Sequence, residues 1–147
     1  MNGTVKLADF GLVREIRAKP PFTEYVSTRW YRSPEVLLHS RNYNSPMDMF
    51  AMGAIMAEMY TGLPLFPGSN ERDQMGKILQ IMGTPSKDEW PDGYKLASSI
   101  GIELEKSTGK RLDELISRAP PEAISLISCL LQVNPQRRPT AAQVVQH

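Results

Sequence analysis

The stretch from Ser45 to Thr61 constrains the fold of this 147-residue chain more than any other. Ser45 is a good N-cap, Pro46 is favoured at the first helical position, and Gly62 is a typical helix stop. Nearly every side chain between them is apolar, so a helix over 45–61 is hydrophobic on all of its faces. A helix of this kind belongs inside a domain. We therefore expect a central helix on which other elements pack.

The flanking segments predict further helices and one short strand. Residues 5–8 are predicted to form a strand, and residues 84–118 a polar excursion. Helices are predicted over 33–39, 70–82, 121–131 and 140–146. A chain of 147 residues, 41% hydrophobic and 22% charged, has the size and composition of one ordinary globular domain. We expect a mainly α fold.

Composition excludes several classes of function. A formal net charge of +1 gives no electrostatic reason to bind nucleic acid or a membrane surface, and no apolar run is long enough to cross a bilayer. The start of the chain, residues 1–4, does not resemble a signal peptide. Cys129 is the single cysteine, so no internal disulfide forms and a reducing compartment is expected. Within the helix over 121–131 we interpret Cys129 as a small core residue.

A second segment, from Asp9-Phe10-Gly11 to Ser33-Pro34-Glu35, carries the candidate chemistry. Thr23 and Tyr25 flank Glu24 near its middle. The arginines of the segment are Arg14, Arg17, Arg29 and Arg32. A phosphate on a hydroxyl adds about −1.5 to −2 charges and three acceptor oxygens that guanidinium groups bind bidentately. A single arginine is usually a solvated surface residue, but four around a Thr-x-Tyr pair favour a phosphorylation switch.

The run Thr23–Glu35 resembles the activation segment of the mitogen-activated and cyclin-dependent kinase group. The run Glu89–Ser99 is similar to the male-germ-cell-associated and intestinal-cell kinase branch of that group. The resemblance covers essentially all of residues 1–147 and implies a partial protein kinase domain, truncated at both ends, from the C-terminal lobe of a two-lobed α+β fold. Its expected parts are the activation segment 9–35, the central helix 45–61, the group-specific insert 84–118 and the C-terminal helices to residue 147.

The resemblance also implies roles for individual residues. Asp9 is the expected Mg²⁺ ligand for Mg-ATP, with Phe10 packed into the interior and Gly11 free to turn. Thr23 and Tyr25 are the expected phosphorylation sites. Arg14 is expected to receive the Thr23 phosphate, Arg29 and Arg32 that of Tyr25, and Val26, Thr28 and Arg29 to form the substrate platform.

Two further residues of the resemblance are structural. Glu35 is expected to pair with Arg138 in a buried ion pair, and Asp48 to anchor the central helix to the backbone of a catalytic loop. Each carboxylate also has a simpler explanation. Asp9 suits a strand-to-loop turn, and Glu35 and Asp48 are favourable in the first turn of a helix.

Several parts of a complete kinase have no counterpart in these residues. Nothing before Asp9 supplies a glycine-rich loop, the strand lysine or its helix glutamate, and the catalytic-loop aspartate and asparagine are missing. We therefore expect no catalytic residue here, no tight binding of ATP or Mg²⁺, and no phosphotransfer by this chain alone. Several apolar side chains of the central helix should then face water, namely some of Met49, Phe50, Met52, Ile55, Met56 and Met59.

Two classes of function remain open. In the first, the parent protein is a proline-directed serine/threonine kinase that an upstream kinase activates, acting on proteins with Ser/Thr-Pro sites. In the second, the chain is a non-catalytic module that competes for docking partners through 84–118 and the helix over 70–82. A plain surface excursion is the simpler interpretation of 84–118. The resemblance implies an intracellular location, in the cytoplasm, the nucleus or both, with a link to the cilium.

Overall fold

Every regular element in the described part of the chain is a helix. The computed structural model describes residues 3–13, 15 and 28–147. Its α-helices are α1 (Pro34–Leu37), α2 (Pro46–Thr61), α3 (Glu71–Met82), α4 (Pro91–Ser99), α5 (Leu112–Leu115), α6 (Pro121–Leu130) and α7 (Ala141–Val144). Three 3₁₀ turns, η1 (Phe10–Leu12), η2 (Arg29–Tyr31) and η3 (Pro135–Arg137), complete the order. No strand forms within these residues, so the expected mainly α fold is confirmed.

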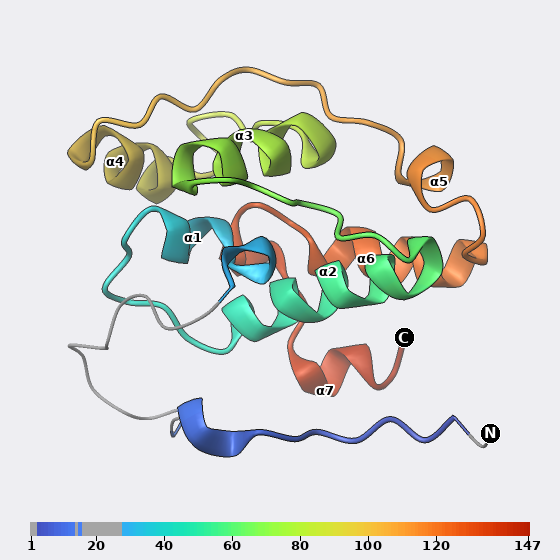
Figure 1. Cartoon of the computed structure of the whole chain (residues 1–147). Helices are drawn as coiled ribbons and strands as arrows, with labels where there is room; N and C mark the ends of the chain where they lie inside the picture. Colours follow the sequence, from blue (N-terminus) through green and yellow to red (C-terminus); the bar gives the residue numbers. More distant parts are fainter. Residues whose placement is uncertain (1–2, 14, 16–27) are drawn as a thin grey trace.

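Helix α2 runs through the middle of the helical body (Figure 1). Helix α6 packs along it, while α3 and α4 lie together on one side and α7 on the other. The fully buried large side chains of the core are Leu37, Leu38, Phe50, Phe66, Met75, Ile78, Leu79, Ile116, Ile127, Leu130 and Leu131. They come from α1, α2, α3, α6 and the connections between them, so one core joins the first and last thirds of this body.

Local capping signals explain where most of the helices begin and end. The side chain of Asn70 accepts from the backbone N–H of Asp73 at the start of α3, and Thr140 forms a capping box with Gln143 at the start of α7. Gly62, with φ 74°, ends α2 by donating its N–H to the Glu58 carbonyl. Ser45 differs from expectation, because its own backbone is helical and its hydroxyl makes no cap hydrogen bond.

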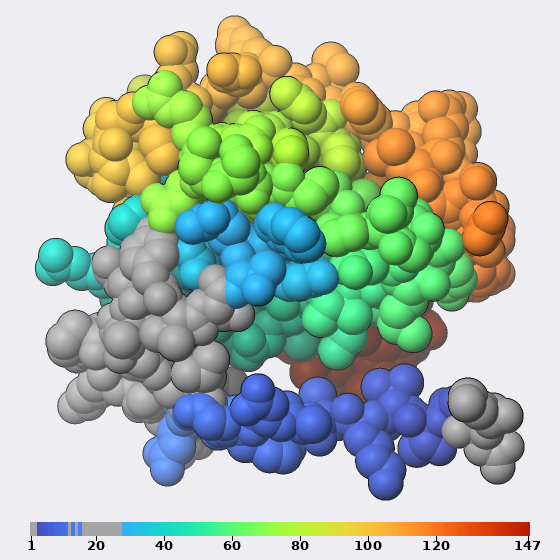
Figure 2. Space-filling model, in the orientation of Figure 1, coloured from blue at the N-terminus to red at the C-terminus, as the bar shows by residue number. Residues whose placement is uncertain are grey.

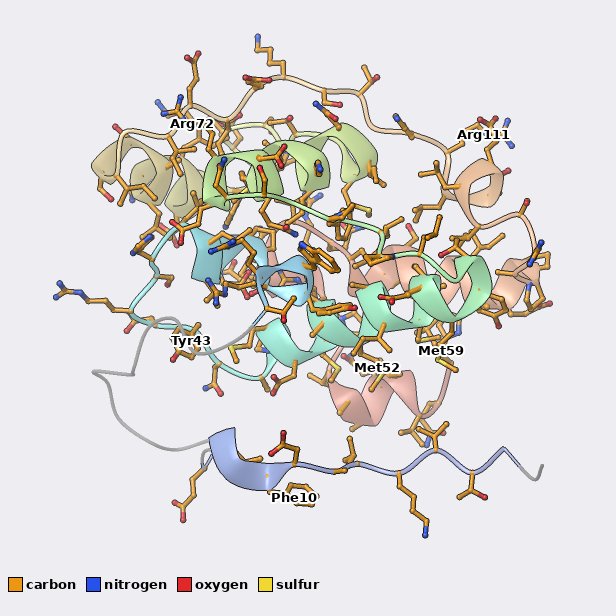
Figure 3. The ribbon with its side chains drawn as sticks, viewed as in Figure 1. Phe10, Tyr43, Met52, Met59, Arg72 and Arg111 are labelled. Carbon is orange, nitrogen blue, oxygen red and sulfur yellow. The ribbon has the colours of Figure 1, made fainter. Side chains whose placement is uncertain are left out.

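Only part of the α2 surface is buried, although its sequence is apolar all round. Phe50, Ala54 and Ala57 are inside, whereas Met52 and Met59 are 40% and 70% exposed. Ile55 is 44% exposed, and Figure 3 shows Met52 and Met59 along the same side of α2. The expectation that several apolar residues of this helix face water is confirmed by these three side chains, while Phe50 is among those that are buried.

Gly53 allows the close crossing of α2 and α6. A Cβ atom at this position would lie 2.8 Å from Cβ of Leu130 and 3.0 Å from Cγ of Leu131. Atoms this close to a helix backbone cannot move away without shifting that helix. A residue without a side chain is therefore required where the two helices meet.

We expect Gly53→Ala to lower the free energy of unfolding by about 1–3 kcal/mol, because the added methyl overpacks this crossing. Gly76 is the matched control, since it lies inside α3 and a Cβ atom added to it would meet nothing within 4 Å. We expect Gly76→Ala to stabilise the protein by about 0.5–1 kcal/mol through the lower backbone entropy of the unfolded chain. Urea unfolding followed by circular dichroism measures both, and equal signs for the two substitutions would contradict this explanation.

The N-terminal segment corrects two expectations. Residues 5–8 are extended but form no strand, because no other described segment pairs with their backbone. Phe10 is 63% exposed rather than packed into the interior. Figures 1 and 2 show residues 3–13 running along one edge of the helical body, next to α7 in this view.

Residues 84–118 are more than a polar surface excursion. The segment contains α4 and α5, and it buries Trp90, Ala97 and Ile116 in the core. Its later part lies against the end of α3, since the Lys110 N–H donates to the Ile81 carbonyl at 2.8 Å and the Thr84 N–H donates to the Ser107 carbonyl at 2.9 Å. The insert is thus an ordered part of the fold.

Cys129 is exposed on α6, so its interpretation as a core residue is wrong. None of the helices in the described ranges combines the length and the hydrophobicity needed to cross a membrane.

Candidate functional site

The segment around η2 is held between α2 and the connection from α2 to α3. The Trp30 indole Nε1–H donates to the Gly68 carbonyl at 3.1 Å, and Arg29 Nη1 donates to the Ser69 carbonyl at 3.2 Å. On the other side, the Tyr31 hydroxyl donates to Oε2 of Glu58 at 2.7 Å. Figure 2 shows the segment around η2, in light blue, at the surface between α2 and α3. Three consecutive side chains thus fix one exposed turn.

Electrostatics strengthens the contact between Tyr31 and Glu58. The pKa of Tyr31 is raised above its ordinary value of 10.0, first by its hydrogen bond to the Glu58 carboxylate, then by burial and by the negative charge of Glu58. Tyr31 therefore remains a hydrogen-bond donor throughout the physiological pH range. Apart from Asp48, Glu58 is the one charged residue of α2. A lone glutamate within an apolar helix is the sequence signal that could have identified Glu58 as a residue with a specific partner.

Arg138 and Glu35 form a buried, bidentate ion pair. The two N–O distances are both 2.8 Å, and the side chains are 0% and 6% exposed. The remaining guanidinium donors reach three backbone carbonyls, those of Gln132 at 2.7 Å, Pro46 at 2.9 Å and Val133 at 3.0 Å. All five N–H donors of the arginine are therefore used. The structure brings together these two residues, 103 positions apart, as the family resemblance implies.

The guanidinium of Arg138 also lies over the Phe50 ring, 5.0 Å from its centroid. Phe50 in turn stacks on Phe66, with ring centroids 5.8 Å apart. The ion pair therefore connects α1, the first turn of α2 and the segment after α6 to the aromatic centre of the core. In this structure the ion pair joins these elements to one another.

Asp9 is the single candidate metal ligand that the sequence provides. Its carboxylate is exposed, and its backbone adopts the left-handed conformation with φ 61°. No group of three His, Cys, Asp or Glu residues in the described ranges could hold a metal ion. One carboxylate satisfies only part of a Mg²⁺ coordination sphere. Among the described residues, Asp9 would therefore need further ligands to complete a Mg²⁺ site.

The other candidate residues fall into two sets. The expected phosphorylation and platform residues Thr23, Tyr25 and Val26, and the expected phosphate receptor Arg14, lie outside the described residues. Thr28, Arg29 and Arg32 lie in or beside η2. Within the described ranges, Nε of Arg29 is buried without a hydrogen-bond acceptor.

Asp48 lies in the first turn of α2, in the place that the resemblance assigns to it. The residue is exposed, yet neighbouring atoms displace enough water from its carboxyl group to raise the pKa above the ordinary value of 3.8. No hydrogen bond to this carboxylate occurs among the described residues. The structure thus places Asp48 near the surface and gives it no anchoring partner in these ranges.

Asp73 fixes the connection that contacts η2, and its contribution depends on pH. Its Oδ2 accepts from the backbone N–H of Ser69 at 2.8 Å and from the Ser69 hydroxyl at 2.9 Å. The backbone bond, the hydroxyl bond and the charge of Lys77 hold the pKa of Asp73 below its ordinary value of 3.8. A folded-state pKa below the unfolded one gives stability that is present at neutral pH and lost as the pH falls through the folded value.

We therefore expect the free energy of unfolding to decrease as the pH falls below 3.8. The decrease should be shallower in Asp73→Asn, because the substitution removes this titrating group. Ser69→Ala removes one of the two donors and should give an intermediate slope. Urea unfolding at a series of pH values measures these slopes, and identical slopes in the three proteins would refute the assignment.

The comparisons with known proteins agree with this architecture. The family model of the protein kinase domain matches residues 1–147. The chain is 54% identical over 143 residues to the serine/threonine-protein kinase MAK of Rattus norvegicus and equally to ICK of Mus musculus, covering 97% of this chain and 23% of each relative. It is 51% identical over 143 residues to cyclin-dependent kinase F-4 of Oryza sativa subsp. japonica, covering 97% of this chain and 31% of that protein.

The chain therefore belongs to the protein kinase family. Within it, the similarity is to serine/threonine kinases of the mitogen-activated and cyclin-dependent group, including the MAK and ICK branch, as the sequence resemblance indicated. The chain spans about a quarter of the length of its MAK and ICK relatives.

Proposed function

We propose that these residues form the substrate-binding part of an ATP-dependent serine/threonine protein kinase. The supporting observation is the exposed turn η2, which three side chains anchor to α2 and to the connection before α3. A fixed surface segment of this kind can orient an extended substrate chain. Rigid positioning is what phosphoryl transfer demands from the protein.

The proposed substrates are proteins with Ser-Pro or Thr-Pro sites. The basis is the similarity of the Val26, Thr28 and Arg29 platform to that of proline-directed relatives. We propose that an upstream kinase phosphorylates Thr23 and Tyr25 and that Arg14, Arg29 and Arg32 receive the two phosphates. Arg29 supports this role because its Nε–H has no acceptor in the described ranges. The family resemblance is also the basis for proposing a location in the cytoplasm or nucleus, with a link to the cilium.

In such a kinase, Asp9 would contribute a ligand to Mg²⁺, which supplies charge neutralisation at the transferring phosphoryl group. The 147 residues provide neither a general base nor a nucleotide clamp. We therefore propose that this chain, tested alone, does not transfer phosphate. Glu35 and Arg138 hold the helical body together, and Asp48 anchors α2 to a neighbouring segment of the longer protein.

Phosphotransfer assays test both halves of this proposal. With Mg-ATP and a Ser-Pro peptide, we expect the 147-residue chain to give no turnover above a matched Asp9→Ala sample. The longer protein that carries this sequence should phosphorylate the Ser-Pro peptide and prefer it to the corresponding Ser-Ala peptide. Turnover by the 147-residue chain would refute its proposed inactivity. A longer protein that does not prefer the Ser-Pro peptide would refute the proposed specificity.

A docking module is the second candidate function, and one observation favours it. A hollow of about 630 Å³ lies where the end of α3, the end of the insert and α6 meet, lined by Ile81, Met82, Lys110, Leu112, Ile124 and Gln132 among others. A protein that binds this surface would compete with partners of a full kinase. Pull-down from cells with the chain and with an Ile124→Glu variant tests this function, because specific docking there requires the variant to lose the partner.

A further inference from the structure

Three hydrogen bonds form a closed ring between η2, the connection before α3, and α3 itself. The Trp30 indole donates to the Gly68 carbonyl at 3.1 Å, and the Gly68 N–H donates to Oε1 of Gln74 at 2.9 Å. Nε2 of Gln74 then donates to the Trp30 carbonyl at 3.3 Å, which closes the ring. The Trp30 side chain is thereby bound to Gly68 and the Trp30 backbone to Gln74, and these two residues are bound to each other.

Gln74 is well suited to this ring because its amide carries both a donor and an acceptor. Its side chain is fully buried, at 0% exposure, so it has no access to water as an alternative partner. Burial of a polar group is costly unless its hydrogen bonds are satisfied. The other buried residues of α3 are the apolar Met75, Ile78 and Leu79, so Gln74 is the one polar side chain among the buried residues of this helix. The amide therefore provides something other than packing.

Gly68 shows that this contact requires close approach. A Cβ atom on Gly68 would lie 2.4 Å from Oε1 of Gln74 and 2.5 Å from its Cα atom. The backbone of Gly68 thus lies directly on the start of α3. Asp73 binds Ser69 next to it, and Lys77 Nζ donates to the Pro67 carbonyl. Three residues of α3 therefore fix the segment 67–69 that holds Trp30 and Arg29.

We propose that Gln74 is a positioning residue for the substrate platform, and that it sets selectivity for the substrate residue that follows the phosphorylated Ser or Thr. It acts by holding the Trp30 carbonyl directly and the Trp30 indole through Gly68. Trp30 itself is 37% exposed, so its placement shapes the surface that a substrate meets. This inference rests on the kinase function proposed above.

The first test uses the longer protein that carries this chain and compares Gln74→Met with Gln80→Met. The two substitutions are chemically identical and lie on the same helix, but Gln80 is exposed and outside the ring. The readout is the ratio of kcat/KM for a Ser-Pro peptide to that for a Ser-Ala peptide. We expect Gln74→Met to lower this ratio about tenfold, the factor that a single net hydrogen bond can supply, and Gln80→Met to leave it unchanged. A substitution that only destabilises the protein would lower kcat/KM for both peptides equally. An unchanged ratio in Gln74→Met would therefore overturn the proposal.

The second test does not depend on catalysis. The Arg32 amide donates to the Arg29 carbonyl within η2, so its hydrogen exchange reports whether this turn is held in place. We expect Gln74→Met and Gly68→Ala to accelerate exchange in residues 28–32, and Gln80→Met to have no effect. Unchanged exchange in Gln74→Met would overturn the positioning role even if the protein is not a proline-directed kinase. Accelerated exchange without any peptide preference in the unsubstituted protein would refute the proposed specificity, while the positioning of Trp30 by Gln74 would stand.

Discussion

Replacing Arg138 by methionine is expected to lower the free energy of unfolding by about 3–5 kcal/mol, because the substitution leaves the Glu35 carboxylate buried without its partner. The same change removes donors from the carbonyls of Gln132, Pro46 and Val133. A loss of this size is a large part of a typical domain stability of about 5–15 kcal/mol. Urea or thermal unfolding followed by circular dichroism measures it.

Arg137 provides the matched control at the neighbouring position. It also pairs with a glutamate, since its Nη1 lies 2.9 Å from Oε1 of Glu89, but the two side chains are 52% and 42% exposed. Exposed ion pairs contribute about 0–1 kcal/mol, so Arg137→Met should have little effect. Similar losses for Arg137→Met and Arg138→Met would contradict the importance of burial.

A double substitution separates the cost of an unpaired charge from the value of the pair. If the stranded Glu35 carboxylate causes most of the loss, then Arg138→Met combined with Glu35→Leu should be more stable than Arg138→Met alone. Arg138→Lys keeps the charge but cannot supply five donors in a planar fork, so we expect it to be destabilising as well. A double variant less stable than the single one would indicate that the pair itself is strongly favourable.

Local signals in the sequence predicted the helical part of the fold well. The expected helix over 45–61 corresponds to α2, and the one over 70–82 to α3 with Asn70 as its cap. Caps, prolines at first helical positions and glycine stops act within one turn, so they can be recognised without tertiary information. The mainly α fold followed from these segments together.

Which face of each element is buried was harder to predict. An apolar helix has no preferred inner face in its sequence, so nothing distinguished Phe50, which is inside, from Met52, which is partly outside. The prediction of a strand over residues 5–8 was wrong for a related reason. An extended segment becomes a strand only with a partner for its backbone, and local composition does not reveal whether one is present.

The residues that fix η2 depend on contacts between distant positions. Trp30 is 38 residues from Gly68 and 44 from Gln74 in the ring of hydrogen bonds. No spacing rule connects such residues, and neither Gly68 nor Gln74 was predicted from the sequence. The pairing of Glu35 with Arg138 was foreseen only because the chain resembles a known family.

The second large effect on stability is expected from a substitution of Trp90, which lies within residues 84–118. Its side chain is 3% exposed, and a Cβ atom on Gly93 would lie 2.1–2.3 Å from the indole ring, so the backbone of α4 rests directly on it. We expect Trp90→Ala to lower the free energy of unfolding by about 3–5 kcal/mol through lost burial and the cavity left behind. Ile100→Ala is the control within the same insert, because Ile100 is 36% exposed and its truncation should cost clearly less than that of Trp90.

The form of the Trp90→Ala transition also decides how the insert relates to the rest of the kinase domain. Asn134, the N-cap of η3, donates from Nδ2 to the Glu89 carbonyl at 2.7 Å, and Arg137 of η3 binds the Glu89 side chain, so the start of the insert is tied to η3, which follows α6. We therefore expect one cooperative transition shifted as a whole, with faster hydrogen exchange in α6 as well as in α4. Faster exchange confined to 84–118 would mean instead that the insert unfolds separately. In a single unit, a partner bound to the insert stabilises α3 and α6, and through α3 the segment 67–69 that holds η2.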